Sequence, residues 1–187
     1  ADGMFVQPIH GKGVRVIWLK GETDMLGALE EVESFGEFAK RNNAVASTDV
    51  KSFEHLVCTE QLSRRLGFKV GEKLIRVVRV RSLNGNARQV DHGYFLESIA
   101  KGLTPEIAAR SIYDYLEHKR GVKVMASRRT VSVELANDED CSYLDLGKYN
   151  CVAVMESQSY TSDGILFEVT HARTHPEIFH YRVNSKR

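Results

Sequence analysis

Two arginines separated by one residue, Arg79 and Arg81, are the side chains in this sequence whose spacing points most directly to chemistry. They lie in an apolar run over residues 74–83 that has the composition of a β-strand. In a strand, residues i and i+2 point to one face about 6.6 Å apart, so both guanidinium groups share a side. Each can grip a phosphate or a carboxylate through paired, charge-assisted hydrogen bonds. The pair therefore indicates an anion site, and a solvated strand face paired with nearby acids is the alternative reading.

Signatures of catalysis or metal binding are weak. The sequence contains no GxSxG elbow, P-loop, HExxH or GxGxxG motif. His171 and His175 have a metal-ligand spacing for a helix, but their segment reads as a strand, and we interpret them as two partly exposed histidines. Cys58, Cys141 and Cys151 are odd in number with no CxxC, so we expect buried or inert thiols. We predict no enzyme activity, no cofactor and no metal ion.

The composition is that of an ordinary globular protein. The chain has 187 residues, of which 42% are hydrophobic and 27% charged, and 26 Lys plus Arg against 25 Asp plus Glu. A net charge of +1 gives no global attraction to DNA or acidic membranes, so a local surface or a missing segment must contact any nucleic acid. No apolar run approaches the ~18 residues of a membrane span, and no secretory signal is present. We expect a cytoplasmic protein that does not contact a membrane.

The elements that position the arginines read as strands joined by hairpins, with short helices between them. Two apolar runs flank Asn84-Gly85, the preferred centre of a type I′ turn, which predicts a long hairpin over residues 72–96. Helices are expected after caps at Thr59, Thr104, Ser111 and Asn137, ending near Gly67, Gly121 and Gly147. Further strands are expected over residues 44–58, 122–135, 152–160, 165–173 and 179–183. The order predicts an α+β fold with an antiparallel sheet rather than βαβ units.

The first residues resemble an internal segment rather than a natural start. Alternating runs over residues 4–9 and 14–19 flank His10-Gly11-Lys12-Gly13, which predicts a hairpin with a basic tip. Since an isolated hairpin is marginal in water, we expect that a preceding segment is absent. Residues 20–43 carry Met25, Leu26 and Leu29 at helical spacing and then a break at 34–36, so we interpret them as a linker helix or loop leading into a short helix.

Four segments carry a family resemblance through their order: residues 79–85 (RVRSLNG), 91–95 (DHGYF), 111–117 (SIYDYLE), and 167–170 (FEVT) running into 179–181 (FHY). Together they resemble the effector-binding UTRA domain of bacterial GntR-family transcription regulators of the HutC subfamily, over about residues 34–183. The hairpin around Lys12 resembles the wing of the winged helix-turn-helix that precedes this domain. We predict a truncated wing at 1–20, a linker at 21–33 and a UTRA domain at 34–187.

The resemblance implies a chorismate-lyase-like fold, an antiparallel sheet flanked by helices with a pocket on one side, and a homodimer. It places Arg79 and Arg81 on an effector phosphate and gives Lys12 a role at the operator DNA. The resemblance implies that the backbone amides of Ser34, Phe35 and Gly36 approach the anion. It implies that Asp91 and Glu168 accept hydrogen bonds from sugar hydroxyls. The polar neighbours Ser111, Tyr113 and Thr170 complete the implied effector-binding positions. Three of these residues have an alternative role that does not involve a ligand: a helix cap for Ser111, a core aromatic for Tyr113 and an arginine partner for Asp91.

Within the family the chain looks most like trehalose-operon repressors, which implies trehalose 6-phosphate as the effector. It departs from the wider pattern in two places. Asp91 stands where many members have glutamate, and Thr174-His175-Pro176-Glu177 replaces a stretch with an arginine at the pocket rim. An amino-sugar phosphate, a carboxylate, an enzyme of the same fold and a module without a small ligand stay open as alternatives.

Overall fold

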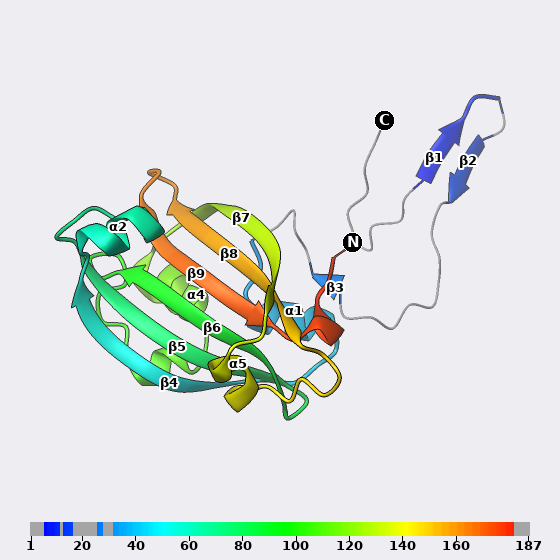
Figure 1. Ribbon diagram of the computed structural model, residues 1–187. Coiled ribbons are helices and arrows are strands. Elements are labelled where there is room, and N and C mark those ends of the chain that lie inside the picture. Colours follow the sequence, from blue (N-terminus) through cyan, green and yellow to red (C-terminus); the bar gives the residue numbers. More distant parts are fainter. Residues whose placement is uncertain (1–5, 12, 17–25, 28–31, 182–187) are drawn as a thin grey trace.

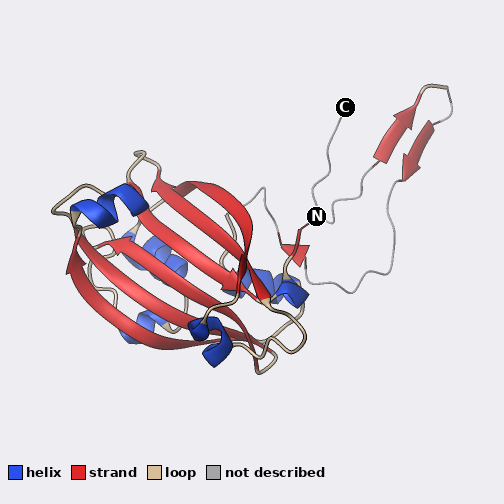
Figure 2. Ribbon diagram, in the orientation of Figure 1, coloured by secondary structure: helices blue, strands red, loops and turns tan. Residues whose placement is uncertain are grey.

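A six-stranded antiparallel sheet forms the centre of the computed structural model, which describes residues 6–11, 13–16, 26–27 and 32–181 (Figure 1). In spatial order its strands are β4 (Ala46–Val57), β5 (Lys73–Leu83), β6 (Asn86–Leu96), β9 (Leu166–Thr174), β8 (Cys151–Thr161) and β7 (Val124–Leu135). Strands dominate this part of the chain and the helices are short (Figure 2). The predicted α+β class with an antiparallel sheet is confirmed.

The helices begin where the sequence places their caps. They are α1 (Phe35–Arg41), α2 (Glu60–Leu66), α3 (Pro105–Ala108), α4 (Ile112–Asp114) and α5 (Asp138–Tyr143), with a π-helical turn η1 (Tyr115–Lys119) and a 3-10 turn η2 (Pro176–Ile178). The side chains of Thr59, Thr104, Ser111 and Asn137 each accept a hydrogen bond from the backbone N–H three residues on. These four predicted helix starts are confirmed.

Strand β5 separates two chemical environments by simple alternation. Val78 packs on one face against Val90 and against Leu144 and Leu146, which follow α5. Arg79 points to the other face, on the side of α4, so α4 and α5 cover opposite sides of the sheet (Figure 1). A larger core that includes Phe95 and Phe167 fills the space between the sheet and the helices of the chain's middle third. The sheet therefore carries its arginines on a helix-covered face.

The β5–β6 hairpin has the predicted turn and one irregularity. Asn84 and Gly85 have φ values of 51° and 82°, the positive pair that a type I′ turn requires. Leu83 pairs with Asn86 and Ser82 with Ala87, but Arg81 pairs with Gln89, so the register shifts by one residue between Ser82 and Arg81. A bulge of this kind changes which face the following side chains occupy.

Several predictions about the linker and the ends are wrong. Leu26 is not helical: Leu26–Gly27 forms strand β3, which pairs in parallel with β10 (His180–Tyr181). The predicted last strand over residues 179–183 is confirmed in its described part as β10, which joins β3 rather than the six-stranded sheet. Residues 35 and 36 do not form a break, because α1 begins there. The helix capped by Asn137 ends at Tyr143, short of Gly147.

The N-terminal hairpin is present as β1 (Val6–Ile9) and β2 (Gly13–Val16), which pair antiparallel. Lys12 and the outer ends of the two predicted strands lie outside the described residues. The domain boundaries at residues 20 and 33 stay predictions. Within the described ranges, no helix is long and apolar enough to cross a membrane.

The prediction that both histidines are partly exposed is wrong for His175. His175 is buried and its Nε2 lies 3.1 Å from the carbonyl oxygen of Asp145, because it closes the junction between β9 and the loop after α5. Cys141 is exposed on α5, whereas Cys58 is buried. His171 binds Glu156 on the neighbouring strand instead of acting together with His175.

Candidate functional site

A cavity of about 560 Å³ lies on the arginine-bearing face of the sheet, between the strands and helices α1 and α4. All of the predicted effector-binding residues line it: Ser34, Phe35, Gly36, Arg79, Arg81, Asp91, Ser111, Tyr113, Glu168 and Thr170. They come from α1 and its cap, from β5, β6 and β9, and from α4 and its cap. Segments far apart in the sequence thus meet at one hollow of the size that small-molecule sites usually have.

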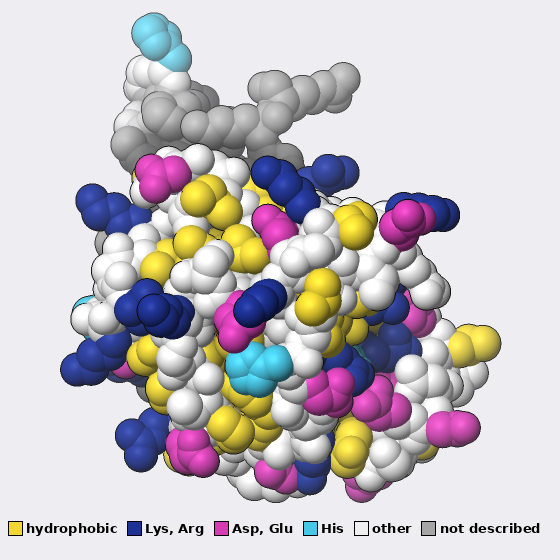
Figure 3. All heavy atoms as spheres, turned by 90° about the vertical axis from the view of Figure 1, so that its left-hand side faces the viewer, with side chains coloured by type: hydrophobic (Ala, Val, Ile, Leu, Met, Phe, Trp, Pro, Cys, Tyr) yellow, Lys and Arg dark blue, Asp and Glu magenta, His cyan; other side chains and the backbone are white. Residues whose placement is uncertain are grey.

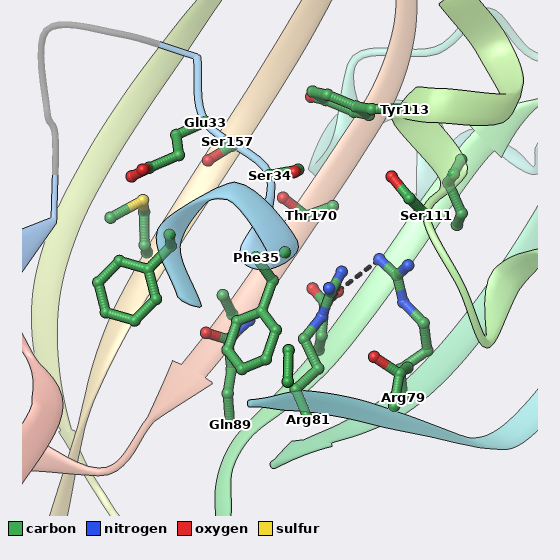
Figure 4. Close-up of a pocket in the computed structure, with 18 of the residues that line it drawn as sticks. Glu33, Ser34, Phe35, Arg79, Arg81, Gln89, Ser111, Tyr113, Ser157 and Thr170 are labelled. Carbon is green, nitrogen blue, oxygen red and sulfur yellow. Dashed lines mark hydrogen bonds and ion pairs between the residues drawn. The ribbon is translucent and has the colours of Figure 1, made fainter. Parts of the chain in front are cut away.

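Arg79 and Arg81 converge as the spacing predicts, and they meet a carboxylate (Figure 4). Asp91 lies opposite Arg79 on β6, and its Oδ2 accepts from Arg79 Nη2 at 2.6 Å. The same oxygen accepts from Nη2 and Nε of Arg81 at 2.8 and 3.1 Å. Two guanidinium groups therefore share one carboxylate oxygen. The reading of Asp91 as an arginine partner fits this geometry, and the cavity beside the cluster leaves room for a second anion.

The arginine cluster is buried and carries surplus positive charge. Arg79 and Asp91 are only 3% and 2% exposed, and Arg79 Nε has no hydrogen-bond partner among the described residues. Burial, together with the neighbouring Arg81, lowers the pKa of Arg79 to about 10. Burial alone would raise the pKa of Asp91, but the two guanidinium groups outweigh it and bring that pKa to about 2. At neutral pH the cluster therefore has two positive charges and one negative charge.

A second group of polar side chains surrounds Glu168 in the same cavity. Tyr113, on α4, donates its hydroxyl to Glu168 Oε2 at 2.5 Å, and Ser159 on β8 lies 3.0 Å from the tyrosine oxygen. Burial raises the pKa of Glu168, while the hydrogen bond from Tyr113 and the charge of Arg79 act in the opposite direction. Burial and the nearby carboxylate raise the pKa of Tyr113 as well, so its hydroxyl stays protonated. This group offers hydroxyl donors and a carboxylate acceptor.

Helix α1 contacts the arginine cluster through an aromatic ring. The guanidinium carbon of Arg81 lies 5.1 Å from the centre of the Phe35 ring, a cation–π contact. Ser34 and Glu37 form a capping box: the Ser34 N–H donates to the Glu37 carboxylate and the Glu37 N–H donates to the Ser34 hydroxyl. The Ser34 amide is therefore engaged in the helix cap, which corrects the expectation that all three amides of residues 34–36 face an anion.

Ser111 has the cap role that we weighed as its alternative, because its hydroxyl accepts from the Asp114 N–H, yet it also lines the cavity. Further polar lining residues escaped the sequence analysis: Glu33, Ser47, Thr48, Gln89, Arg110, Ser127, Arg129, Ser157 and Ser159. Ser127 and Arg129 alternate along β7, and Ser157 and Ser159 alternate along β8. That alternation was the available signal, although nothing in the sequence shows which face of each strand meets the arginines.

The chemistry of this cavity is that of recognition. It joins a cationic end to an end lined by hydroxyl groups, an arrangement suited to a small anion attached to a polyhydroxyl body. In the part of the chain that the structure describes, no group of three or more His, Cys, Asp or Glu side chains could hold a metal ion.

Comparison with known proteins places this arrangement in a family. The UTRA domain model matches residues 41–180. The chain is 27% identical over 181 residues to the HTH-type transcriptional regulator TreR of Bacillus subtilis (strain 168), covering 97% of this chain and 75% of TreR. It is 31% identical over 143 residues to the HTH-type regulator YydK of the same organism, covering 74% of this chain and 57% of YydK.

Solved structures agree with the sequence comparison. The crystal structure of YydK superposes with a TM-score of 0.77 at 22% identity, covering 97% of this chain and 76% of that one. The effector-binding domain of the B. subtilis trehalose repressor TreR superposes with a TM-score of 0.67 at 27% identity, covering 75% of this chain and 98% of that domain. From the extent of the UTRA match and these relatives, the chain belongs to the UTRA domain family and is homologous to GntR-family transcription regulators.

Proposed function

We propose that this chain senses a sugar phosphate, with trehalose 6-phosphate as the first candidate, and controls the DNA binding of a repressor of the HutC type. Operator DNA contact belongs to a winged helix-turn-helix that includes the β1–β2 hairpin and Lys12, and two copies of the protein act together. The chain spans 75%, 66% and 57% of the lengths of TreR, NagR and YydK, which leaves room for such a segment. The activity is binding without covalent change.

The observation that carries this proposal is that the guanidinium groups of the buried Arg79 and the partly buried Arg81 share one carboxylate oxygen beside a cavity. A single carboxylate neutralises only one of the two positive charges, and Arg79 retains a buried N–H donor. An incoming phosphate would supply both negative charge and acceptor oxygens at that place. Inside a protein such charge-assisted bonds are stronger than in water, so the anion dominates the affinity.

The other end of the cavity supports a sugar as the body of the ligand. Tyr113, Ser159 and Glu168 offer hydroxyl donors and a carboxylate acceptor, the partners that sugar hydroxyls use. The relative named as the trehalose repressor TreR supports trehalose 6-phosphate as the first candidate, and an amino-sugar phosphate is the second. Carboxylate effectors form the third class.

Transmission toward DNA runs through α1 in this proposal. Arg81 contacts both Asp91 and the Phe35 ring, so an anion that draws Arg81 away from either contact shifts the position that α1 prefers. The segment before α1 leads back to the β1–β2 hairpin. A ligand changes DNA affinity only through its differential affinity for the two arrangements, typically about 1–3 kcal/mol.

Calorimetric titration tests the proposal with trehalose 6-phosphate, free trehalose, glucosamine 6-phosphate and inorganic phosphate. We expect binding of a phosphosugar and loss of binding for free trehalose. Arg81→Ala should weaken phosphosugar affinity by about 10- to 150-fold, the effect of losing about 1.5–3 kcal/mol of charge-assisted bonding. Arg76→Ala is the matched control, because Arg76 lies on the same strand but on the opposite face.

Each outcome separates one part of the proposal. Unchanged phosphosugar affinity in both Arg79→Ala and Arg81→Ala would remove the anion clamp. Tighter binding of glucosamine 6-phosphate than of trehalose 6-phosphate would replace the sugar and keep the clamp. Recovery of a chemically altered ligand after incubation would establish an enzyme instead of a sensor.

A further inference from the structure

The cavity has a third side, which is apolar and which the proposed phosphate and sugar contacts do not use. Four large apolar side chains from α1, β8 and the η2 turn with its C-cap form this apolar side: Phe38, Met155, Ile178 and Phe179. Each of the four is only partly buried, and none is part of either hydrophobic core of the described chain. The face seen in Figure 3 carries charged side chains of both signs instead. Apolar surface inside a concave site is typical of a ligand contact.

The docking of α1 on the rest of the chain does not require this apolar side. Ala39 is the residue that α1 buries, whereas the neighbouring Phe38 stays partly exposed. The Phe38 ring lies beside the Phe35 ring, with the two ring centres 6.3 Å apart, and Phe35 contacts Arg81. The two aromatic rings therefore lead from the arginine cluster toward the apolar side.

One carboxylate borders the apolar side. Glu33 lines the cavity, and its side chain is 14% exposed. Arg41 donates from Nε and Nη2 to the two oxygens of Glu33, each at 2.8 Å, and its guanidinium carbon lies 6.0 Å from the centre of the Phe38 ring. These bonds hold the carboxylate in place and use only part of its acceptor capacity, since two carboxylate oxygens accept about four hydrogen bonds. The apolar side thus has a fixed acceptor beside it.

A sugar ring has two kinds of surface that match this arrangement. Its C–H groups pack on aromatic and aliphatic side chains, and its hydroxyl groups donate to carboxylate oxygens. Glu33 and Ser157 lie across the cavity from Arg79 and supply polar partners there (Figure 4). The apolar side therefore fits a part of the ligand that carries no charge.

One ring is too small to fill both the apolar side and the Glu168 end. Met155 pairs with Ala172, which lies four residues from Glu168 on β9. All three residues line the cavity, and four residues of a strand span about 13 Å. A pyranose ring is much smaller than this separation, so a ligand that reaches both places has two rings.

We propose that the apolar side is a second sugar subsite, so that the effector is a disaccharide monophosphate. Its unphosphorylated ring lies against Phe38, Met155 and Ile178 and donates hydroxyl hydrogen bonds to Glu33. This inference rests on the proposed function, because it needs the phosphate at the arginine pair. It gives Glu33 and Ile178 the choice between a phosphorylated disaccharide and a phosphorylated monosaccharide. The subsite also adjoins the linker, because Phe179 directly precedes β10, which pairs with β3.

Calorimetric titration of the full chain with trehalose 6-phosphate and glucose 6-phosphate tests the subsite, because these ligands differ only by the second ring. Trehalose 6-phosphate should bind at least about tenfold more tightly. Glu33→Gln removes the charged acceptor and should weaken trehalose 6-phosphate binding about tenfold. Ile178→Ala removes apolar contact and should weaken it about fivefold. Neither change should weaken glucose 6-phosphate binding by more than about twofold, because that ligand lacks the second ring.

Glu60→Gln and Ile165→Ala are the matched controls. Glu60 forms an exposed ion pair with Arg64 on α2, and Ile165 is exposed at the β8–β9 turn. These changes remove the same chemical groups outside the cavity and should leave both affinities unchanged. Thermal unfolding checks that each variant keeps its fold. Since Ile178→Ala leaves the ion pair of Glu33 intact, the test does not depend on one variant.

The outcomes separate the subsite from the function on which it rests. Sucrose 6-phosphate serves as a second two-ring probe, and tighter binding of it alone would keep the subsite and replace trehalose. If neither two-ring ligand binds more tightly than glucose 6-phosphate, the second subsite is overturned and the arginine clamp remains. Equal weakening of both trehalose 6-phosphate and glucose 6-phosphate in Glu33→Gln and Ile178→Ala would also overturn it. A chain that binds no phosphosugar would overturn the subsite together with the proposed function.

Discussion

The two ends of the cavity hold the same chemical group in opposite electrostatic states. Asp91, at the arginine end, lies between two guanidinium groups, which bring its pKa to about 2. Glu168, on the neighbouring strand β9, has a tyrosine and a serine hydroxyl nearby, and burial raises its pKa. Both carboxylates are almost fully buried, at 2% and 4% exposure, so depth does not explain the contrast.

The difference lies in the charge of the partners. Burial disfavours any charged carboxylate. Two guanidinium groups in direct contact reverse that preference at Asp91, whereas the hydrogen bond from Tyr113 and the charge of Arg79 lower the pKa of Glu168 by less than burial raises it. Hydroxyl groups donate hydrogen bonds without supplying charge, so they offset the cost of burial only in part. The arginine end is therefore held as a permanent ion cluster, whereas the Glu168 end can change its protonation with its surroundings. Mutations at the two ends should consequently have different kinds of effect.

The largest effect should come from Arg79→Ala. This change leaves the buried Asp91 with Arg81 as its remaining cation and opens a gap in the sheet face. Breaking a buried ion pair from one side typically costs about 3–5 kcal/mol when the remaining charge loses its compensation, but here Arg81 still compensates Asp91. We therefore expect a loss near the lower end of that range in the free energy of unfolding, measured by urea denaturation monitored by circular dichroism.

A double-mutant cycle completes the test. Arg79→Ala combined with Asp91→Ala removes both members of the pair, and the double variant should be less destabilised than the sum of the two single variants. Additive losses would mean that the two side chains contribute independently, and the contrast between the ends of the cavity would lose its electrostatic cause. Arg76→Ala again serves as the control on the same strand, and its more exposed ion pair with Glu54 should cost no more than about 1 kcal/mol.

The next effect concerns affinity rather than stability. Asp91→Asn removes the negative charge that already occupies the arginine pair, and the freed charge should bind inorganic phosphate about tenfold more tightly or better. The same change leaves the buried Arg79 and the partly buried Arg81 without their shared carboxylate, so the fold should become less stable without ligand. Phosphate titration by calorimetry measures the gain. Asp163→Asn, at the exposed β8–β9 turn, is the control and should leave the phosphate affinity unchanged. An unchanged phosphate affinity in Asp91→Asn would show that an anion does not bind at these arginines.

The arginine pair could be predicted from the sequence, and its carboxylate partner could not be predicted from spacing. Alternation within residues 74–83 places Arg79 and Arg81 on one face, as the structure confirms. A tight turn at Asn84-Gly85 with regular pairing would place Val90 opposite Arg79. The bulge next to Arg81 moves the register by one residue and brings Asp91 to that place instead. The family resemblance had singled out Asp91, whereas the local pattern contains no sign of the bulge.

The linker shows the opposite failure, in which a local pattern was misleading. Leu26 and its apolar neighbours have helical spacing, but Leu26–Gly27 pairs with His180–Tyr181 from the far end of the chain. Long-range pairing outweighs weak helix propensity in so short a segment. Ser127 and Arg129 escaped prediction for a related reason. Their place in the cavity depends on the order β6-β9-β8-β7, which the chain order does not specify.

The smallest effect should appear at the Glu168 end as a dependence of stability on pH. Because burial raises the pKa of Glu168 above 4.5, the folded chain keeps this proton over a pH range in which the unfolded chain has lost it. The stabilising contribution is therefore complete below pH 4.5 and is lost as the pH rises through the raised value. The pH dependence of the Asp91 contribution has the opposite sign, because the pKa of Asp91 is lowered. Its stabilising contribution is present above pH 3.8 and is lost as the pH falls through about 2.

Glu168→Gln isolates the first of these two contributions, since glutamine does not ionise. The difference in unfolding free energy between this variant and the unmodified chain should shift in favour of the variant as the pH rises above 4.5, by up to about 1.4 kcal/mol for each unit by which the pKa is raised. Urea denaturation at a series of pH values measures this difference, with Glu117→Gln, at an exposed position, as the matched control. Parallel profiles for the two variants would mean that Glu168 ionises as freely as a surface carboxylate, and that the hydroxyl groups around it stabilise its charge as well as the arginines stabilise that of Asp91.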